Sequence, residues 1–256
     1  MRSFTFHPGP RLIAGADKSK EIADLVSEGP VLFVTDEQLI GLGITDSAQR
    51  ALEASGRPVT VFDKVEADPS RATLEAAVEA GRSAGAASVV GFGGGSPMDV
   101  AKLAAYLLGS GDDLDAIWGV DIAKGQGLPL VLVPTTAGTG SEATPISVIT
   151  CEGSVKLAVN ARPLVAEWAV LDPQLTVGLP QGVTAATGID AIVHAVEAYT
   201  SARVKNPLSD GLAREALRLL TTNLLTACDN PRDLAAREAM LLGAHLAGLA
   251  FSNAPV

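Results

Sequence analysis

The stretch Ser88–Asp99, with the sequence SVVGFGGGSPMD, decides the fold class of this 256-residue chain. Its first five residues have the composition of a buried strand, and three glycines, Gly93–Gly95, follow directly. Ser96 is a favourable N-cap residue, Pro97 suits the first helical position, and Asp99 completes a Ser-x-x-Asp capping box. The stretch therefore predicts a strand, a loop without Cβ atoms, and a helix whose N-terminus faces that loop.

A loop of this kind suits a phosphate group. Without Cβ atoms the backbone comes close to a ligand, and the free N–H groups of a helix N-terminus attract anions. The pattern therefore predicts a phosphate or pyrophosphate site at Gly94, Gly95 and Ser96. The alternative is a glycine-rich turn between a strand and a helix that binds nothing, because a short glycine pattern alone has low specificity.

The same alternation of elements extends on both sides of this stretch. Strand-like segments occur at 31–35, 58–62, 88–92 and 128–133, and helix-like segments at 18–27, 46–55, 70–84 and 97–108. Segments 3–6 and 11–14 predict an opening hairpin around Pro8-Gly9-Pro10. Buried strands that alternate with amphipathic helices are typical of a parallel sheet with helices on both faces.

The pattern changes near residue 175. Beyond Pro180 the sequence predicts three helices, at 183–200, 207–225 and 231–250. Asn-Pro pairs at 206–207 and 230–231 start the last two, with asparagine as the N-cap. We therefore expect a parallel-sheet α/β domain over residues 1–177 and an all-α domain over residues 178–256.

Composition excludes several classes of protein. The formal net charge is −10, with 47% apolar and 19% charged residues, and the basic residues are scattered. This charge disfavours nucleic acid, because phosphate binding needs a basic face. Cys151 and Cys228 fit a reduced compartment. The amino terminus lacks the apolar core of a signal peptide, and no apolar run approaches the roughly 18 residues of a membrane span. We expect a soluble, cytoplasmic protein without nucleic-acid or membrane partners.

Further polar residues follow the predicted strands. Asp36 directly follows the strand-like segment 31–35. An acid at the carboxyl end of a strand can bind ribose hydroxyls and repel a 2′-phosphate, although an aspartate in this position is also a common helix cap. The loop 134–142, PTTAGTGSE, follows the fourth strand; the alternative for it is a turn cluster. Its hydroxyl residues are Thr135, Thr136, Thr139 and Ser141. Lys156 can neutralise phosphate or remain a solvated lysine. Together these residues favour a ligand site at this edge of the sheet over a glycine-rich turn that binds nothing.

Asp190 and His194 lie four residues apart, on one face of the predicted helix. A carboxylate and an imidazole so placed can both bind one Zn²⁺ or Fe²⁺. The alternative is a capping box between Thr187 and Asp190, with His194 merely paired to Asp190. Two ligands are too few for a tight site. Neither His7, in the expected hairpin, nor His245, in an apolar stretch, is expected to be a ligand.

Four motifs in this order resemble the iron-containing alcohol dehydrogenase family. They are GGGSPMD at 93–99, PTTAGTGSE at 134–142, Asp172-Pro173 and GIDAIVHAVE at 188–197. The resemblance covers the chain from end to end. It implies a dinucleotide-binding α/β domain followed by an all-helical domain, as in dehydroquinate synthase, with cofactor and metal in the cleft between them.

The resemblance also assigns roles to residues of the predicted NAD site. It implies that Asp36 binds the ribose and that Gly94, Gly95 and Ser96 hold the pyrophosphate. Asp99 would lie near the nicotinamide. Lining the cofactor would be Thr135, Thr136, Thr139 and Ser141, with Lys156 beside the ribose and phosphates. Asp190 and His194 match the first two ligands of a divalent metal, Fe²⁺ or Zn²⁺.

The family has two more histidine ligands on later helices, so we expect this chain to be truncated before its metal site is complete. Segment 251–254 is similar to the stretch that leads into the first of them. The implied function is NAD(P)-dependent interconversion of an alcohol and an aldehyde or ketone, by metal-assisted hydride transfer, in a homodimer or larger assembly. The alternatives are an enzyme of the same fold similar to maleylacetate reductase or glycerol dehydrogenase, and a nucleotide-binding module without turnover.

Overall fold

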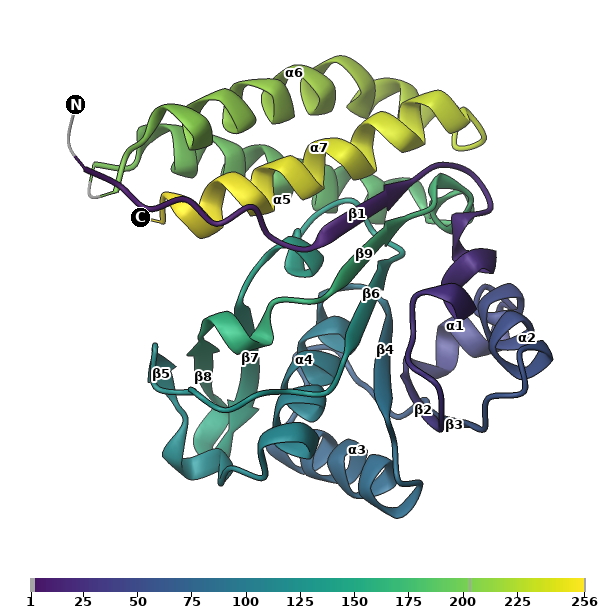
Figure 1. Ribbon diagram of the computed structural model, residues 1–256. Coiled ribbons are helices and arrows are strands. Elements are labelled where there is room, and N and C mark those ends of the chain that lie inside the picture. Colours follow the sequence, from purple (N-terminus) through teal and green to yellow (C-terminus); the bar gives the residue numbers. More distant parts are fainter. Residues whose placement is uncertain (1–2, 203, 256) are drawn as a thin grey trace.

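The structure, a computed structural model, describes residues 3–202 and 204–255. Its centre is a six-stranded sheet of order β1-β9-β6-β4-β2-β3 in which all neighbouring strands are parallel (Figure 1). The strands are β1 (Arg11–Ala14), β2 (Val31–Val34), β3 (Val59–Phe62), β4 (Ser88–Gly93), β6 (Leu130–Pro134) and β9 (Trp168–Leu171). The predicted parallel sheet is therefore confirmed.

Helices cover both faces of this sheet. One face carries η1 (Lys18–Asp24), α1 (Glu37–Gly41) and α2 (Asp46–Ala54), and the other carries α3 (Arg71–Ser83) and α4 (Gly95–Ser110). Because side chains alternate along a strand, Val31 and Phe33 enter the first core and Leu32 and Val34 the second. All four are fully buried, which explains the continuous apolar run of β2.

A smaller sheet lies beside the first and has the order β5-β8-β7. Its strands are β5 (Gly119–Val120), β7 (Ile146–Cys151) and β8 (Val155–Asn160), and short 3-10 turns η2 (Leu114–Ala116), η4 (Glu152–Ser154) and η5 (Arg162–Leu164) lie near them in the chain. This sheet was missed in the sequence, since a two-residue strand and a hairpin with exposed positions carry a weak periodic pattern.

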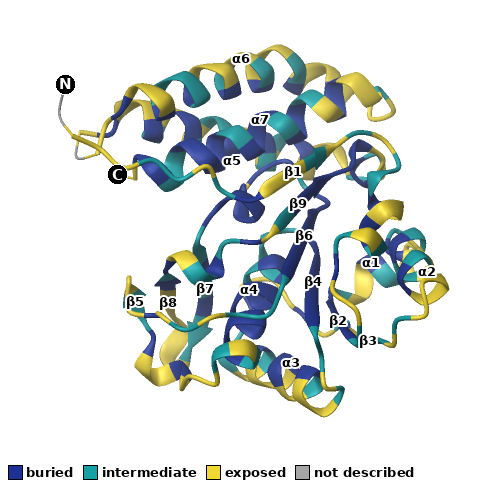
Figure 2. Ribbon diagram, viewed as in Figure 1, coloured by how far each residue is buried: buried dark blue, intermediate teal, exposed yellow. Residues whose placement is uncertain are grey.

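The last part of the chain is helical, as predicted. It contains α5 (Gln181–Thr200), α6 (Pro207–Asp229) and α7 (Leu234–Asn253), and η6 (Pro173–Thr176) leads into it. Each of these three helices packs its buried face against the other two, and together they form the helical layer of the molecule (Figure 2). Helix α7 is long and apolar enough to cross a membrane, with a mean hydropathy of 1.2, which the sequence analysis did not expect. Of its most apolar stretch, 56% is buried inside the molecule, as is typical of the core helix of a soluble protein.

Several local predictions were wrong. The described residues 3–9 form no strand, and β1 pairs in parallel with β9 instead of forming a hairpin. Helix α4 begins at Gly95 with Gly94 as its N-cap, so Ser96 lies in the first turn and is no cap. Helix α7 begins after Asp233, whose carboxylate accepts a hydrogen bond from Ala236 N, and not after Asn230. The cap at Asn206 is confirmed by its bond from Ser209 N at 2.9 Å.

Candidate functional site

The strand order reverses between β2 and β4, which are neighbours in the sheet. From β2 the chain continues to β3 on one side, and from β4 it continues to β6 on the other. In open parallel sheets, ligands bind outside the carboxyl ends of the strands at such a switch point. Asp36 follows β2 there and Gly93–Ser96 follows β4, so the fold brings these two predicted features to one place.

The glycine loop is built for close approach of a ligand. Gly93 has φ +152°, and a Cβ there would lie 2.7 Å from Pro97 Cγ, so only glycine fits. Gly94 has φ −75°, which any residue adopts. Among the described residues only Thr136 comes within 4 Å of a Cβ at Gly94, at 3.7 Å. The space beside Gly94 is therefore open, and the N-terminus of α4 faces it.

Asp36 is both a helix cap and an acid at the switch point. Its Oδ1 accepts a hydrogen bond from Leu39 N at 2.9 Å, which caps α1. The Leu39 side chain in turn lies against Gly93, so the start of α1 and the glycine loop are adjacent. Within the described chain Asp36 has no ion-pair partner, since nearby Lys64 pairs with Glu37 and Asp63. Its carboxylate is half-buried and keeps an oxygen for a ligand.

The loop after β6 lies against the glycine loop. Thr135 N donates to Gly93 O at 2.9 Å. A Cβ at Gly95 would lie 3.0 Å from Thr139 Cγ2, which shows how closely the two loops pack. The structure thus brings the predicted hydroxyl residues to the predicted phosphate loop. Lys156, by contrast, lies on β8 of the small sheet and forms an exposed ion pair with Asp68 at 2.6 Å.

Asp99 takes part in contacts that the sequence did not predict. Its Oδ1 accepts a hydrogen bond from Ser141 Oγ at 2.6 Å, and its Oδ2 accepts one from Val148 N at 3.0 Å. It therefore joins α4 to the loop and to β7, and does not close a capping box. Beside it lies Lys102, a fully buried cation that sequence reasoning missed. Its only signal was a lone charge in the apolar run VAKLAAYLLG at 100–109.

The loop also contacts the helical layer at two glycines. A Cβ at Gly138 would lie 2.8 Å from Thr187 Cβ of α5. Gly140 has φ +60°, and a Cβ there would lie 2.8 Å from Gly248 Cα of α7. These glycines therefore allow two helices to pack directly on the loop backbone.

A buried pair reinforces this contact. His245 Nδ1 of α7 lies 3.2 Å from Glu142 Oε1 of the loop, and both side chains are 3% exposed. In the sequence, only the acidic residue that ends the PTTAGTGSE motif, Glu142, pointed to such a pair, because its partner His245 lies 103 residues later. His245 is thus a core histidine with a polar partner, as expected, and its exclusion as a metal ligand stays a prediction.

Asp190 and His194 share one face of α5, with His194 Nδ1 3.9 Å from Asp190 Oδ2. Among the described atoms, the buried His194 Nδ1 has no hydrogen-bond partner. The alternative of a capping box is wrong, because α5 begins at Gln181 and the Thr187 hydroxyl donates to Val183 O. In residues 3–202 and 204–255, no group of three or more His, Cys, Asp or Glu side chains is arranged to hold a metal. The pair supplies two donors.

Sequence comparison agrees with this arrangement. The model of the family described as "Iron-containing alcohol dehydrogenase" matches residues 9–173, and the model described as "Fe-containing alcohol dehydrogenase family, C-terminal" matches residues 184–256. The chain belongs to the iron-containing alcohol dehydrogenase family. The predicted family and fold are thereby confirmed.

Known members of the iron-containing alcohol dehydrogenase family are similar over most of this chain. Long-chain-alcohol dehydrogenase 1 of Geobacillus thermodenitrificans is 46% identical over 229 residues, which cover 88% of this chain and 58% of that enzyme. A 1,3-propanediol oxidoreductase structure matches with TM-score 0.95 and 34% identity, covering 100% of this chain and 68% of that one. Sulfoacetaldehyde reductase from Bifidobacterium kashiwanohense, solved with NAD⁺, matches with TM-score 0.88 and 30% identity, covering 99% and 68%. The chain thus spans between 58% and 68% of these relatives.

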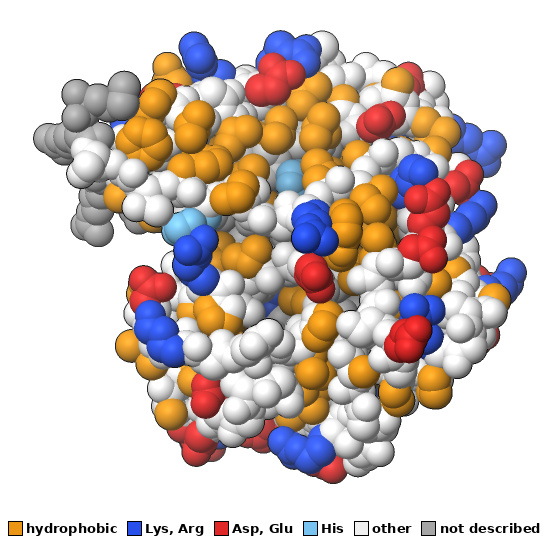
Figure 3. Space-filling view, viewed as in Figure 1, with side chains coloured by type: hydrophobic (Ala, Val, Ile, Leu, Met, Phe, Trp, Pro, Cys, Tyr) orange, Lys and Arg blue, Asp and Glu red, His pale blue; other side chains and the backbone are white. Residues whose placement is uncertain are grey.

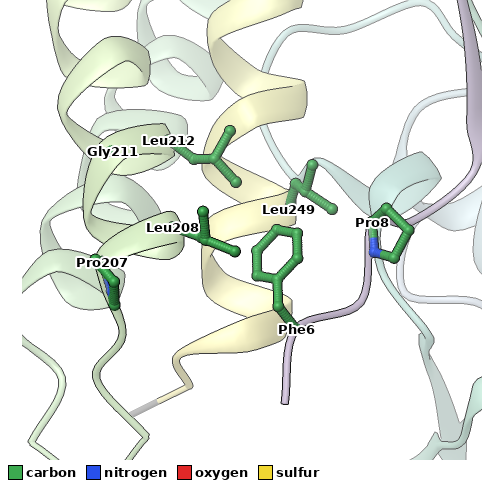
Figure 4. A pocket seen from close by; sticks show the side chains of 7 residues that line it. All are labelled: Phe6, Pro8, Pro207, Leu208, Gly211, Leu212 and Leu249. Carbon is green, nitrogen blue, oxygen red and sulfur yellow. The ribbon is translucent and has the colours of Figure 1, made fainter. Parts of the chain in front are cut away.

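The structure also has an apolar groove away from the switch point. It has a volume of about 400 Å³ and lies where the N-terminal segment crosses α6 and α7 (Figure 4). Its lining residues are Phe6, Pro8, Pro207, Leu208, Gly211, Leu212 and Leu249. Apolar side chains gather over the helical layer on this face (Figure 3). Its lining side chains carry no acid, base or metal donor, so we assign it no catalytic part.

Proposed function

We propose that this protein is an NAD-dependent oxidoreductase that interconverts an alcohol and an aldehyde or ketone with the help of a bound divalent metal. The observation that carries the proposal is that the glycine loop and the Asp190–His194 helix both contact one loop. The loop after β6 touches the glycine loop through Thr139 and α5 through Gly138. Its contact on α5 is Thr187, and Asp190 and His194 follow one and two helical turns later on the same face.

The residues at the switch point fit NAD. The open space beside Gly94 and the free N–H groups of Gly95 and Ser96 suit the pyrophosphate. Asp36 is assigned to the adenosine ribose, and Thr136 and Thr139 face the glycine loop. Asp99, Thr135 and Ser141 complete the proposed site, and Lys156 is assigned to its edge.

The pair on α5 fits part of a metal site. The buried, unpartnered His194 Nδ1 and the half-exposed Asp190 carboxylate are nitrogen and oxygen donors that suit Fe²⁺ or Zn²⁺. A divalent metal at this pair supplies a Lewis acid for the alcohol or carbonyl oxygen, and bound NAD carries the hydride. The protein's own task would be to hold the cofactor and the metal close enough for hydride to pass directly between the nicotinamide and the substrate carbon.

Two relatives support the proposed substrate class and cofactor. One relative is named for long-chain alcohols and another was solved with NAD⁺, and from these we infer a small-molecule alcohol or carbonyl substrate for this protein. We also assign it to the cytoplasm and to a homodimer or larger assembly. A second candidate, a nucleotide-binding module without turnover, is favoured by one observation: the described residues offer two metal donors rather than three.

The test is NADH formation by the purified chain, followed by absorbance, with NAD⁺, primary alcohols of increasing length, and Fe²⁺ or Zn²⁺. Alcohol-dependent and metal-dependent NADH formation supports the dehydrogenase. Saturable NADH binding without turnover under every condition supports the binding module. If the chain neither binds NADH nor turns over, both candidates are wrong.

A further inference from the structure

Lys102 of α4 is the largest charged side chain that is completely buried in the described molecule. Its Nζ donates to Ser141 Oγ at 2.6 Å, to Thr144 Oγ1 at 3.2 Å and to Ile146 O at 2.6 Å. A lysine ammonium has three protons, and all three are used on the segment 141–146. Lys102 therefore has none left for a cofactor or a substrate.

The surroundings of Lys102 favour its charged form. The Ser141 hydroxyl donates its own proton to Asp99 Oδ1, and the Thr144 hydroxyl donates to Ser141 O at 3.3 Å. Burial lowers the pKa of Lys102, whereas the carboxylates of Asp99 and Glu142 oppose that shift. Asp99 Oδ1 lies 3.5 Å from Nζ. The ammonium has one proton for each of the three acceptors and an adjacent carboxylate that balances its charge, so the geometry fits the ammonium.

This buried group fixes the far end of the loop, while the near end carries the proposed cofactor contacts. At the far end Asp99 also accepts Val148 N, and Ser147 Oγ donates to Asp99 O at 2.8 Å. Ser141 N donates to Thr139 Oγ1 at 3.2 Å, and Thr139 packs against Gly95. The place of Thr139 beside the glycine loop therefore depends on how Ser141 is held.

We propose that Lys102 is a positioning residue for the NAD site: its ammonium, without touching the cofactor, fixes the loop 135–146 against the glycine loop. Asp99 and Ser141, which belong to the proposed site, connect Lys102 to it, because Ser141 bonds to both Lys102 and Asp99. The inference rests on the proposed function, since it gives these residues a task in the same NAD site.

The test is the variant Lys102→Met, which keeps the apolar stem and removes the ammonium. Affinities for NADH and for AMP are measured by calorimetry on the same preparation, because AMP lacks the nicotinamide half. Losing one set of charge-assisted contacts predicts about a tenfold rise in the Kd for NADH, with the Kd for AMP within about twofold. Leu103→Ala is the matched control, since Leu103 is equally buried on α4 and apolar. It should lower the melting temperature without changing the ratio of the two Kd values.

Normal NADH binding by Lys102→Met would overturn the inference, and so would a parallel loss of NADH and AMP like that of Leu103→Ala. If Lys102→Met does not fold, Thr144→Val, which removes one acceptor at nearly constant volume, must show a smaller change of the same ratio, and an unchanged ratio overturns the inference. An unmodified chain that binds neither NADH nor AMP rejects the proposed function. In that case amide hydrogen exchange tests the role of Lys102 on its own: peptides covering 135–148 must exchange faster in Lys102→Met than in Leu103→Ala, and equal rates overturn the inference.

Discussion

Replacing Asp36 by serine separates its two roles. Serine caps a helix as well as aspartate does, so the bond to Leu39 N survives and the stability should change by less than about 0.5 kcal/mol. The negative charge, however, is lost. Because no cation pairs with Asp36 among the described residues, that charge acts in full on a ligand at the switch point.

The expected magnitude follows from Coulomb's law. A 2′-phosphate carries about two negative charges at neutral pH, and a ribose-binding carboxylate lies about 5 Å from it. With an effective dielectric constant of about 50 for a half-buried group, the repulsion is about 2–3 kcal/mol. The unmodified chain should therefore bind NADH about 30–150-fold more tightly than NADPH, and Asp36→Ser should remove most of that preference.

The assay is a fluorescence titration of both cofactors with both chains. Glu37→Gln is the control, because it removes a neighbouring exposed charge that already pairs with Lys64. It should leave the preference within about twofold of the original. Equal affinity of the unmodified chain for NADH and NADPH would refute the assignment of Asp36, as would an Asp36→Ser variant with an unchanged preference.

Two further predictions concern stability and metal binding. Asp172 is buried and accepts from Asp17 N, Ser19 N, Ser19 Oγ and Gln174 N. Asp172→Ala should cost about 3 kcal/mol and lower the melting temperature by about 6–12 °C in a thermal melt. If Asp172→Ala lost less stability than Asp172→Asn, the assigned role of the Asp172 carboxylate would be contradicted. Asp190 and His194 should bind Co²⁺, a spectroscopic probe for Fe²⁺ and Zn²⁺, too weakly to survive gel filtration; a His194→Phe variant with the same Co²⁺ spectrum would exclude the pair as ligands.

Local chemistry made the glycine loop predictable from the sequence. The strand, the three glycines and the following helix at 88–108 depend on neighbouring residues, and the structure has them with the start of α4 shifted to Gly95. Asp36 was placed correctly for the same reason, since it directly follows a strand. The three C-terminal helices were also expected, because their apolar periodicity extends over many residues.

Contacts between distant segments were not predictable in this way. Turn residues at 8–10 favoured a local hairpin, but Arg11 pairs with Trp168, and Gly9 lies against Leu249 of α7. Strand β9 was missed because four apolar residues carry no periodic signal. Lys102 finds its acceptors 39 to 44 residues later, in a loop whose path depends on three helices. Only the folded chain shows that this lysine is buried.

Calorimetric titration of NADH into the unmodified chain and into Gly94→Val tests the central claim, that the switch point is a dinucleotide site. Gly94 has an ordinary backbone conformation, and a Cβ there contacts Thr136 at 3.7 Å or more, so valine should leave the fold and its circular dichroism unchanged. Its side chain would fill the space assigned to the pyrophosphate. The account predicts saturable NADH binding at one site per chain and its loss in Gly94→Val. Equal binding by both chains, or none by the unmodified one, would contradict it.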